Sequence, residues 1–98
     1  MNLSDRAFEL AKGAYSAAKH AEAKAILESE YPDASYDQIL EIYLVAAHMA
    51  DAAYDVGDKL RLGKISEDNT LKNLEERFPG FSDATYKSVI SHGYFISR

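Results

Sequence analysis

Acidic side chains at helical spacing are the feature of this sequence with the clearest chemical potential. From Ala25 to Asp58 the chain has eight Asp or Glu residues and no Lys or Arg. Residues separated by three, four or seven positions share one face of a helix. Six polar residues in this segment have that spacing, and we call them the acidic ridge: Asp37, Glu41, His48, Asp51, Asp55 and Asp58.

An acidic helix face can attract a basic protein surface and speed its docking. Tyrosine suits such contacts because it buries a large area and keeps a polar tip. We therefore predict a non-catalytic protein-protein interaction module, such as a small regulator or inhibitor. The simpler alternative is a solvated face that keeps an apolar helix in solution. The predicted partner contacts are the acidic ridge and four aromatic residues expected nearer the boundary of the core than its centre: Tyr31, Tyr36, Tyr54 and Phe81.

A metal site is a second reading of part of the ridge. His48, Asp51 and Asp55 could converge on one cation if another helix supplied a further ligand, which would suit a metal-dependent helical enzyme. The chain has no His-Glu-x-x-His pair, no EF-hand loop and no cysteine. No Gly-x-Ser-x-Gly elbow or phosphate-binding loop is present either. We accordingly predict no catalytic residue, no metal and no cofactor.

A helix-turn-helix-like DNA-binding regulator is the third reading. It rests on five basic residues around the predicted turn after the long helix: Lys59, Arg61, Lys64, Lys72 and Arg77. A pI near 5.1 argues against it. The would-be recognition helix also has acidic residues that would repel phosphate, among them Glu67 and Glu75. Nucleic acid is therefore not the predicted partner.

Helices must position these residues, since no segment shows the alternation of a strand. Apolar residues at steps of three and four predict a first helix from Leu3 to Glu30, with Ser4 as its N-cap and Gly13 as its weak point. Pro32 ends it, because proline disfavours helical geometry in the residue before it.

A long central helix follows a capping box formed by Ser35 and Gln38. Its apolar stripe runs from Ile39 to Leu60, and three further residues widen the stripe: Leu40, Leu44 and Ala47. We expect it to reach Leu62, about 40 Å at 1.5 Å per residue. Gly63 would stop it in a left-handed conformation, unless Gly57 breaks it earlier.

Two shorter helices complete the prediction. One runs from Glu67 to Arg77 after the cap Ser66, and the other begins after Ser82. The segments Leu27–Ser35 and Leu74–Ser82 share Leu, Glu, an aromatic residue, Pro and Ser at matching positions. This echo predicts two junctions built alike, and thus an all-α, compact four-helix domain made of two helical hairpins, with residues 1–98 as a single domain.

Composition sets the remaining expectations. The chain has 98 residues, of which 47% are hydrophobic, and a net charge of −5. This balance is typical of a globular protein. Residues 1–8 lack the features of a secretory signal, and no apolar run is long enough to span a membrane. We expect a cytoplasmic protein with no membrane partner. Boundary tyrosines leave a homo-oligomer open.

Overall fold

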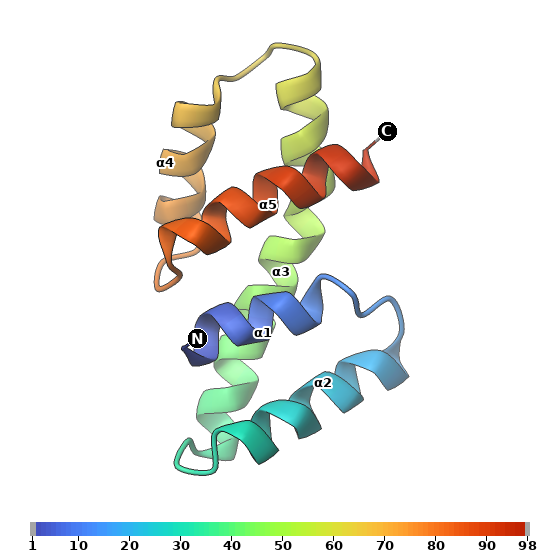
Figure 1. Ribbon diagram of the computed structural model, residues 1–98, viewed down its shortest axis with the longest axis vertical. Coiled ribbons are helices and arrows are strands. Elements are labelled where there is room, and N and C mark those ends of the chain that lie inside the picture. Colours follow the sequence, from blue (N-terminus) through green and yellow to red (C-terminus); the bar gives the residue numbers. More distant parts are fainter. Residues whose placement is uncertain (1, 98) are drawn as a thin grey trace. The chain divides into compact units, whose positions relative to one another are not determined.

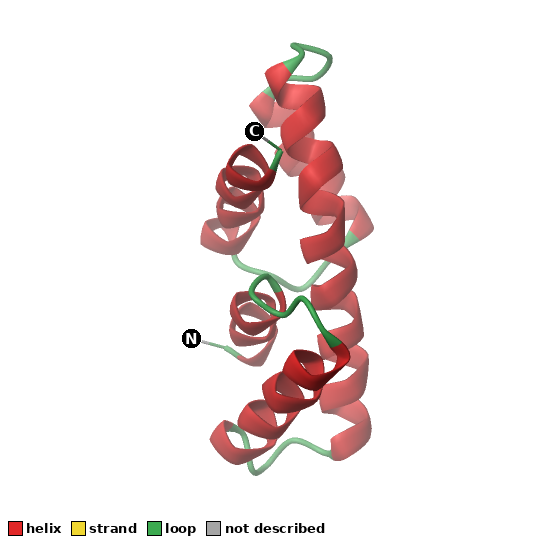
Figure 2. Cartoon of the chain, turned by 90° about the vertical axis from the view of Figure 1, so that its right-hand side faces the viewer, coloured by secondary structure: helices red, strands yellow, loops and turns green. Residues whose placement is uncertain are grey.

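A computed structural model describes residues 2–97. It contains five α-helices and, within this range, no strand (Figures 1 and 2). The helices are α1 (Leu3–Ala11), α2 (Ala17–Glu30), α3 (Tyr36–Arg61), α4 (Glu67–Arg77) and α5 (Asp83–Ile96). The all-helical class is confirmed. The predicted number of four helices is wrong.

The extra helix comes from the first predicted helix, which is two helices, α1 and α2, separated by residues 12–16. Ser16 is the N-cap of α2, where its side chain accepts a hydrogen bond from the Lys19 amide. Because Ser16 also follows the helix-weakening Gly13, the chain ends one helix and starts another within a few residues. The predicted cap Ser4 lies inside α1, and Asn2 caps that helix instead.

The chain's internal contacts divide it into two units, one ending at His48 and the other beginning at Met49. The first unit contains α1, α2 and residues 36–48 of α3. The second contains residues 49–61 of α3, α4 and α5. Each unit therefore consists of three helical segments that follow one another along the chain.

Helix α3 begins and ends nearly where its sequence predicts. The Ser35 hydroxyl accepts a hydrogen bond from the Gln38 amide at 3.1 Å. Gly57 does not break the helix, and Gly63 follows its end with a φ of 70°, a conformation that glycine adopts without strain. The helix ends at Arg61 rather than at Leu62, a difference within the usual fraying of helix ends.

The two predicted junctions are built alike. Tyr31 ends α2 with its amide bonded to the Leu27 carbonyl, and Phe78 ends α4 with its amide bonded to the Leu74 carbonyl. Ser82 then caps α5 as Ser35 caps α3. The recurring aromatic-Pro-x-x-Ser sequence thus has the same structural role in both units.

Each unit has its own set of buried apolar side chains. Those of the first include Phe8, Leu27 and Ile39, and those of the second include Met49, Leu74 and Val89. In the first unit, the Arg6 guanidinium also donates two 3.0 Å hydrogen bonds to the Glu30 carboxylate, which ties α1 to α2. These bonds hold the pKa of Glu30 below its usual value.

None of the helices described in residues 2–97 is both long and apolar enough to span a membrane.

Candidate functional site

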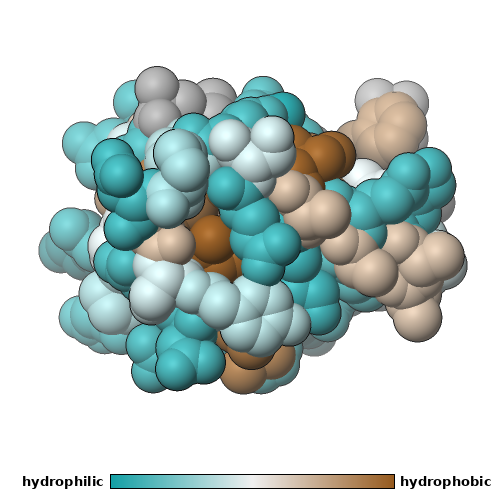
Figure 3. All heavy atoms as spheres, turned by 90° about the horizontal axis from the view of Figure 1, so that it is seen from below, coloured by the Kyte–Doolittle hydropathy of each residue, from teal (hydrophilic) through white to brown (hydrophobic). Residues whose placement is uncertain are grey.

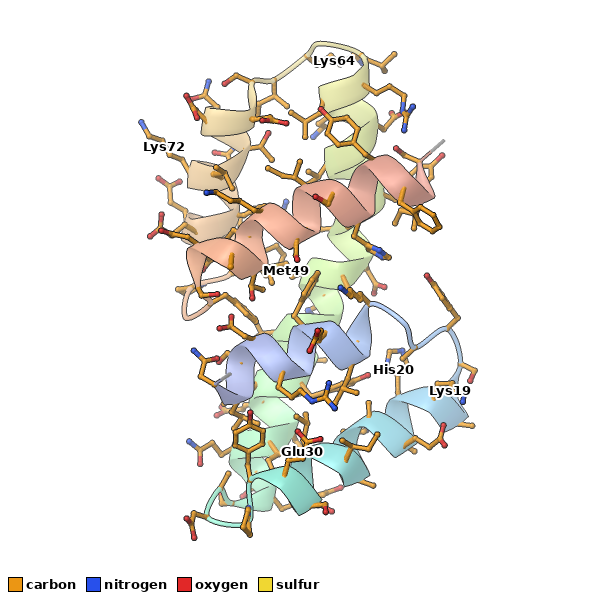
Figure 4. All side chains as sticks on the ribbon, viewed as in Figure 1. Lys19, His20, Glu30, Met49, Lys64 and Lys72 are labelled. Carbon is orange, nitrogen blue, oxygen red and sulfur yellow. The ribbon has the colours of Figure 1, made fainter. Side chains whose placement is uncertain are left out.

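The first unit has an open groove between α2 and α3, with a volume of about 520 Å³. Most of its lining is apolar, and its polar groups come from His20, Lys24 and Tyr43. His20 projects from the first half of α2 (Figure 4). We call this groove the α2–α3 groove, and its lining residues are Ala17, His20, Lys24, Leu40, Tyr43, Leu44 and Ala47.

Helical periodicity explains how the two walls form. Ala17, His20 and Lys24 lie three and four positions apart, so they follow one face of α2. Leu40, Leu44 and Ala47 do the same on α3. These three α3 residues are the ones that widen the apolar stripe in the sequence. They extend beyond the buried core, and they form the groove wall.

A hydrogen bond joins the two helices at the groove. Nδ1 of His20 lies 2.5 Å from the hydroxyl of Tyr43, and the two rings meet edge to face with centroids 5.6 Å apart. Tyr43 is buried, and this burial raises the pKa of its hydroxyl. The pair links α2 to α3 in the first unit. Sequence reasoning missed it, because nothing in the sequence links residues 20 and 43.

Charged side chains flank the groove on both sides. Lys24 belongs to the α2 wall. On α3, Asp37 precedes Leu40 by three positions and Glu41 precedes Leu44 by three, and both acids are exposed. The α3 side of the groove is therefore acidic, whereas the α2 side has the cation Lys24 in its wall and the exposed Glu28 one turn further along.

Leu44 is the most exposed large apolar residue of the groove, with 57% of its surface accessible. It belongs to the α3 wall of the groove. Because it lies one turn after Glu41 and one turn before His48, it also neighbours the acidic ridge. Other apolar side chains are also exposed in the first unit, including Tyr36 and Val45. Figure 3 shows apolar side chains, in brown, at the surface among hydrophilic ones.

The residues of the acidic ridge divide between the units. Asp37, Glu41 and His48 are exposed in the first, and Asp51 and Asp55 are exposed in the second. Asp58 is half-buried. Asp55 forms a 3.1 Å ion pair with Lys59, one turn further along α3. Only the ridge residues Asp37 and Glu41 precede residues of the groove wall by a single helical turn.

The four predicted aromatic contacts have different environments. Tyr36 and Tyr54 are more than half exposed. Tyr31 is half-buried and ends α2, and Phe81 is half-buried with its ring against that of Tyr86, at a centroid distance of 6.0 Å. Tyr36 and Tyr54 thus have surface available for a partner, whereas Tyr31 and Phe81 take part in the two helix junctions.

The readings as a metal site and as a DNA-binding site gain no support from the geometry. Within residues 2–97, no three His, Asp or Glu side chains gather closely enough to hold a metal ion. Several of the basic residues are engaged within the second unit. Arg61 donates a 2.6 Å hydrogen bond to the Tyr94 carbonyl, and the Arg77 guanidinium lies 5.0 Å from the centre of the Phe78 ring. Lys64 lies in the loop before α4, and Lys72 lies on α4 (Figure 4).

Comparison of the chain with protein-family models, with curated proteins and with solved structures finds no match.

Proposed function

We propose that this chain is a non-catalytic protein-interaction module whose α2–α3 groove binds an amphipathic helix of a basic protein partner. The observation that carries the proposal is the groove itself: about 520 Å³, open, largely apolar and bordered by charge. Helices that dock in this way lay an apolar face into a groove between helices of the receiving protein. Such a module suits a small regulator or inhibitor, which acts by occupying its partner's surface.

Apolar burial supplies the affinity in this proposal. Leu44 exposes 57% of its surface, and covering it with a partner's side chains would contribute about 1 kcal/mol. Leu40 and Ala47 extend the same wall by one turn on either side. Three apolar positions at steps of four and three match the period of a helix laid along them.

The charged residues beside the groove indicate the charge of the partner helix. Asp37 and Glu41 lie beside the α3 wall, and the segment from Ala25 to Asp58 contains no Lys or Arg. A partner helix with lysines or arginines along that flank would gain favourable pairs and a faster association rate. On the α2 side, Lys24 favours an acidic residue in the partner. The fitting helix is thus basic overall, with its basic flank over α3.

The test uses a synthetic 18-residue helical peptide with a leucine stripe, lysines along one flank and on the outer face, and glutamates along the other flank. We call it the probe peptide. In a titration followed by amide NMR shifts of the full chain, the first unit's shifts should gather at Ala17, His20, Leu40 and Leu44. A scrambled peptide of the same composition, which lacks the apolar stripe, should cause no saturable shifts.

Leu44→Arg and Val45→Arg form a matched pair of variants. Both residues are exposed and adjacent on α3, but only Leu44 lines the groove. Leu44→Arg should weaken binding of the probe peptide in the first unit at least tenfold, whereas Val45→Arg should change it less than threefold. Equal effects of the two variants, or no binding of the probe peptide by the first unit, would show that the groove is not the binding site.

A further inference from the structure

The second unit has a groove of its own between α4 and α5, with a volume of about 320 Å³. Ile90 lies buried at its floor, Leu71 is half-buried, and the remaining lining residues are polar and exposed. We call it the α4–α5 groove, and its lining residues are Glu67, Asp68, Leu71, Lys87, Ile90 and Ser91.

The two grooves occupy corresponding positions in the two units. The echo between the helix junctions has an offset of 47 residues, since Leu27 matches Leu74 and Ser35 matches Ser82. The same offset relates five residue pairs that line the grooves: His20 and Glu67, Lys24 and Leu71, Leu40 and Lys87, Tyr43 and Ile90, and Leu44 and Ser91. Local cap chemistry accounts for similar junctions, but it does not require a groove at matching positions on both hairpins.

The charges of the two grooves are reversed. In the α2–α3 groove, the cation Lys24 is on the first helix, and the acids Asp37 and Glu41 flank the second. In the α4–α5 groove, the acids Glu67 and Asp68 line the first helix, and the second helix has the cation Lys87 with the exposed Asp83 one turn before it. The more acidic helix is therefore the second one in the α2–α3 groove and the first one in the α4–α5 groove.

From this correspondence we infer that the α4–α5 groove is a second binding site for the same class of ligand, an amphipathic helix with one basic and one acidic flank, bound in the opposite direction. The inference rests on the proposed function of the α2–α3 groove. A helix turned end for end in a groove exchanges its two flanks. The reversed charges of the second groove therefore select the reversed helix.

The second site is the weaker of the two. Its volume is smaller, and Ser91 replaces the exposed Leu44, so a bound helix would cover less apolar surface. Its selectivity would depend more on the pairs with Glu67, Asp68 and Lys87. Because such exposed pairs are screened by salt, its affinity should fall more steeply as ionic strength rises.

The positions of Leu44 and Ser91 provide a matched experiment on the full chain with the probe peptide. Calorimetry should give a stoichiometry of two bound peptides per wild-type chain. As salt is added, binding at the weaker site should be lost first. Leu44→Arg should weaken peptide binding at the tighter site at least tenfold and leave the weaker site unchanged. Ser91→Arg should weaken binding at the weaker site at least tenfold and leave the tighter site unchanged. Circular dichroism would verify that both variants fold, and Lys87→Glu, at an exposed position, provides a second way to weaken the α4–α5 site.

The outcomes separate this inference from the proposed function. If Ser91→Arg and Lys87→Glu change nothing while Leu44→Arg abolishes all binding, the second site does not exist and the first remains. If Leu44→Arg changes nothing, the proposed function fails.

A spin label at one end of the peptide tests the direction of binding. If it broadens amide signals near Leu40 in the first groove, it should broaden those near Tyr94 in the second, since Tyr94 corresponds to Ala47. Broadening near Lys87 instead would contradict the reversal.

Discussion

Gly57 of α3 and Gly93 of α5 meet backbone to backbone in the second unit. A Cβ atom placed on Gly57 would overlap the carbonyl group of Gly93, and one placed on Gly93 would overlap the carbonyl oxygen of Ala53. Both glycines are buried inside helices. Their role is to let the two helices approach more closely than any side chain would allow.

Gly57→Ala should destabilise the second unit, even though alanine is the better helix former by about 1 kcal/mol. The added methyl has no space, and overpacking of this kind costs typically about 1–3 kcal/mol. We expect the melting temperature, followed by circular dichroism, to fall by several degrees. Gly13→Ala is the control, because a Cβ there meets nothing closer than 4.0 Å. Equal stability of the two variants would contradict the close approach.

The sequence predicts much of this fold, because caps and stops act locally. Helix α4 begins at Glu67, after its predicted cap Ser66, and ends at Arg77, both as predicted. The exception is the break between α1 and α2. There the alanine-rich sequence favours a continuous helix, and the competing signals are only Gly13 and the cap Ser16. Local preferences of similar size cannot be ranked without the packing of α1 against α2.

The cap of α1 distinguishes the predicted helix start from the observed one. The Asn2 side chain accepts a 2.8 Å hydrogen bond from the Asp5 amide, whereas Ser4 lies within the helix. Asn2→Ala should therefore lower the free energy of unfolding by about 1 kcal/mol, and Ser4→Ala should change it by less than about 0.5 kcal/mol. Urea denaturation of both variants would measure the difference. A larger loss of stability in Ser4→Ala than in Asn2→Ala would indicate that Ser4 is the cap.

Tyr86 stabilises the junction between α4 and α5. Its buried hydroxyl donates a 2.6 Å hydrogen bond to the Phe78 carbonyl. Tyr86→Phe would leave that carbonyl without this donor and should cost about 1 kcal/mol, measured by urea denaturation. Tyr54→Phe is the matched control, because Tyr54 is 55% exposed and water can reach its hydroxyl. A Tyr86→Phe variant as stable as Tyr54→Phe would mean that the hydrogen bond contributes nothing.

The candidate site was less predictable than the fold. The acidic ridge and the widened stripe of α3 are visible in the sequence, because both follow the helical period of one segment. The groove is not, since it depends on α2 packing beside α3. Its long-range polar contact between His20 and Tyr43 joins residues from different helices. The excess apolar width at Leu40, Leu44 and Ala47 was the available signal, but a wide apolar stripe is equally typical of a more deeply buried helix.

Tyr43 should make the stability of the chain sensitive to alkaline pH. Burial raises the pKa of its hydroxyl in the folded state, so folding favours the protonated form. Above the ordinary tyrosine value, near 10, the unfolded chain loses this proton first and the folded chain still holds it. The stabilising contribution is therefore complete below about pH 10 and is lost as the pH rises through the folded value.

Tyr43→Phe should accordingly show two opposite effects. At neutral pH it loses the hydrogen bond to His20, which should lower the free energy of unfolding by about 1 kcal/mol. Above about pH 10 its stability should fall less steeply than that of the wild type, because one proton fewer is released on unfolding. Urea denaturation at pH 7 and at several values above 10 would measure both effects. Tyr36→Phe, at a position 58% exposed, is the matched control for the loss of a tyrosine hydroxyl. Parallel pH curves for wild type and Tyr43→Phe would show that the Tyr43 hydroxyl titrates alike in the folded and unfolded chain.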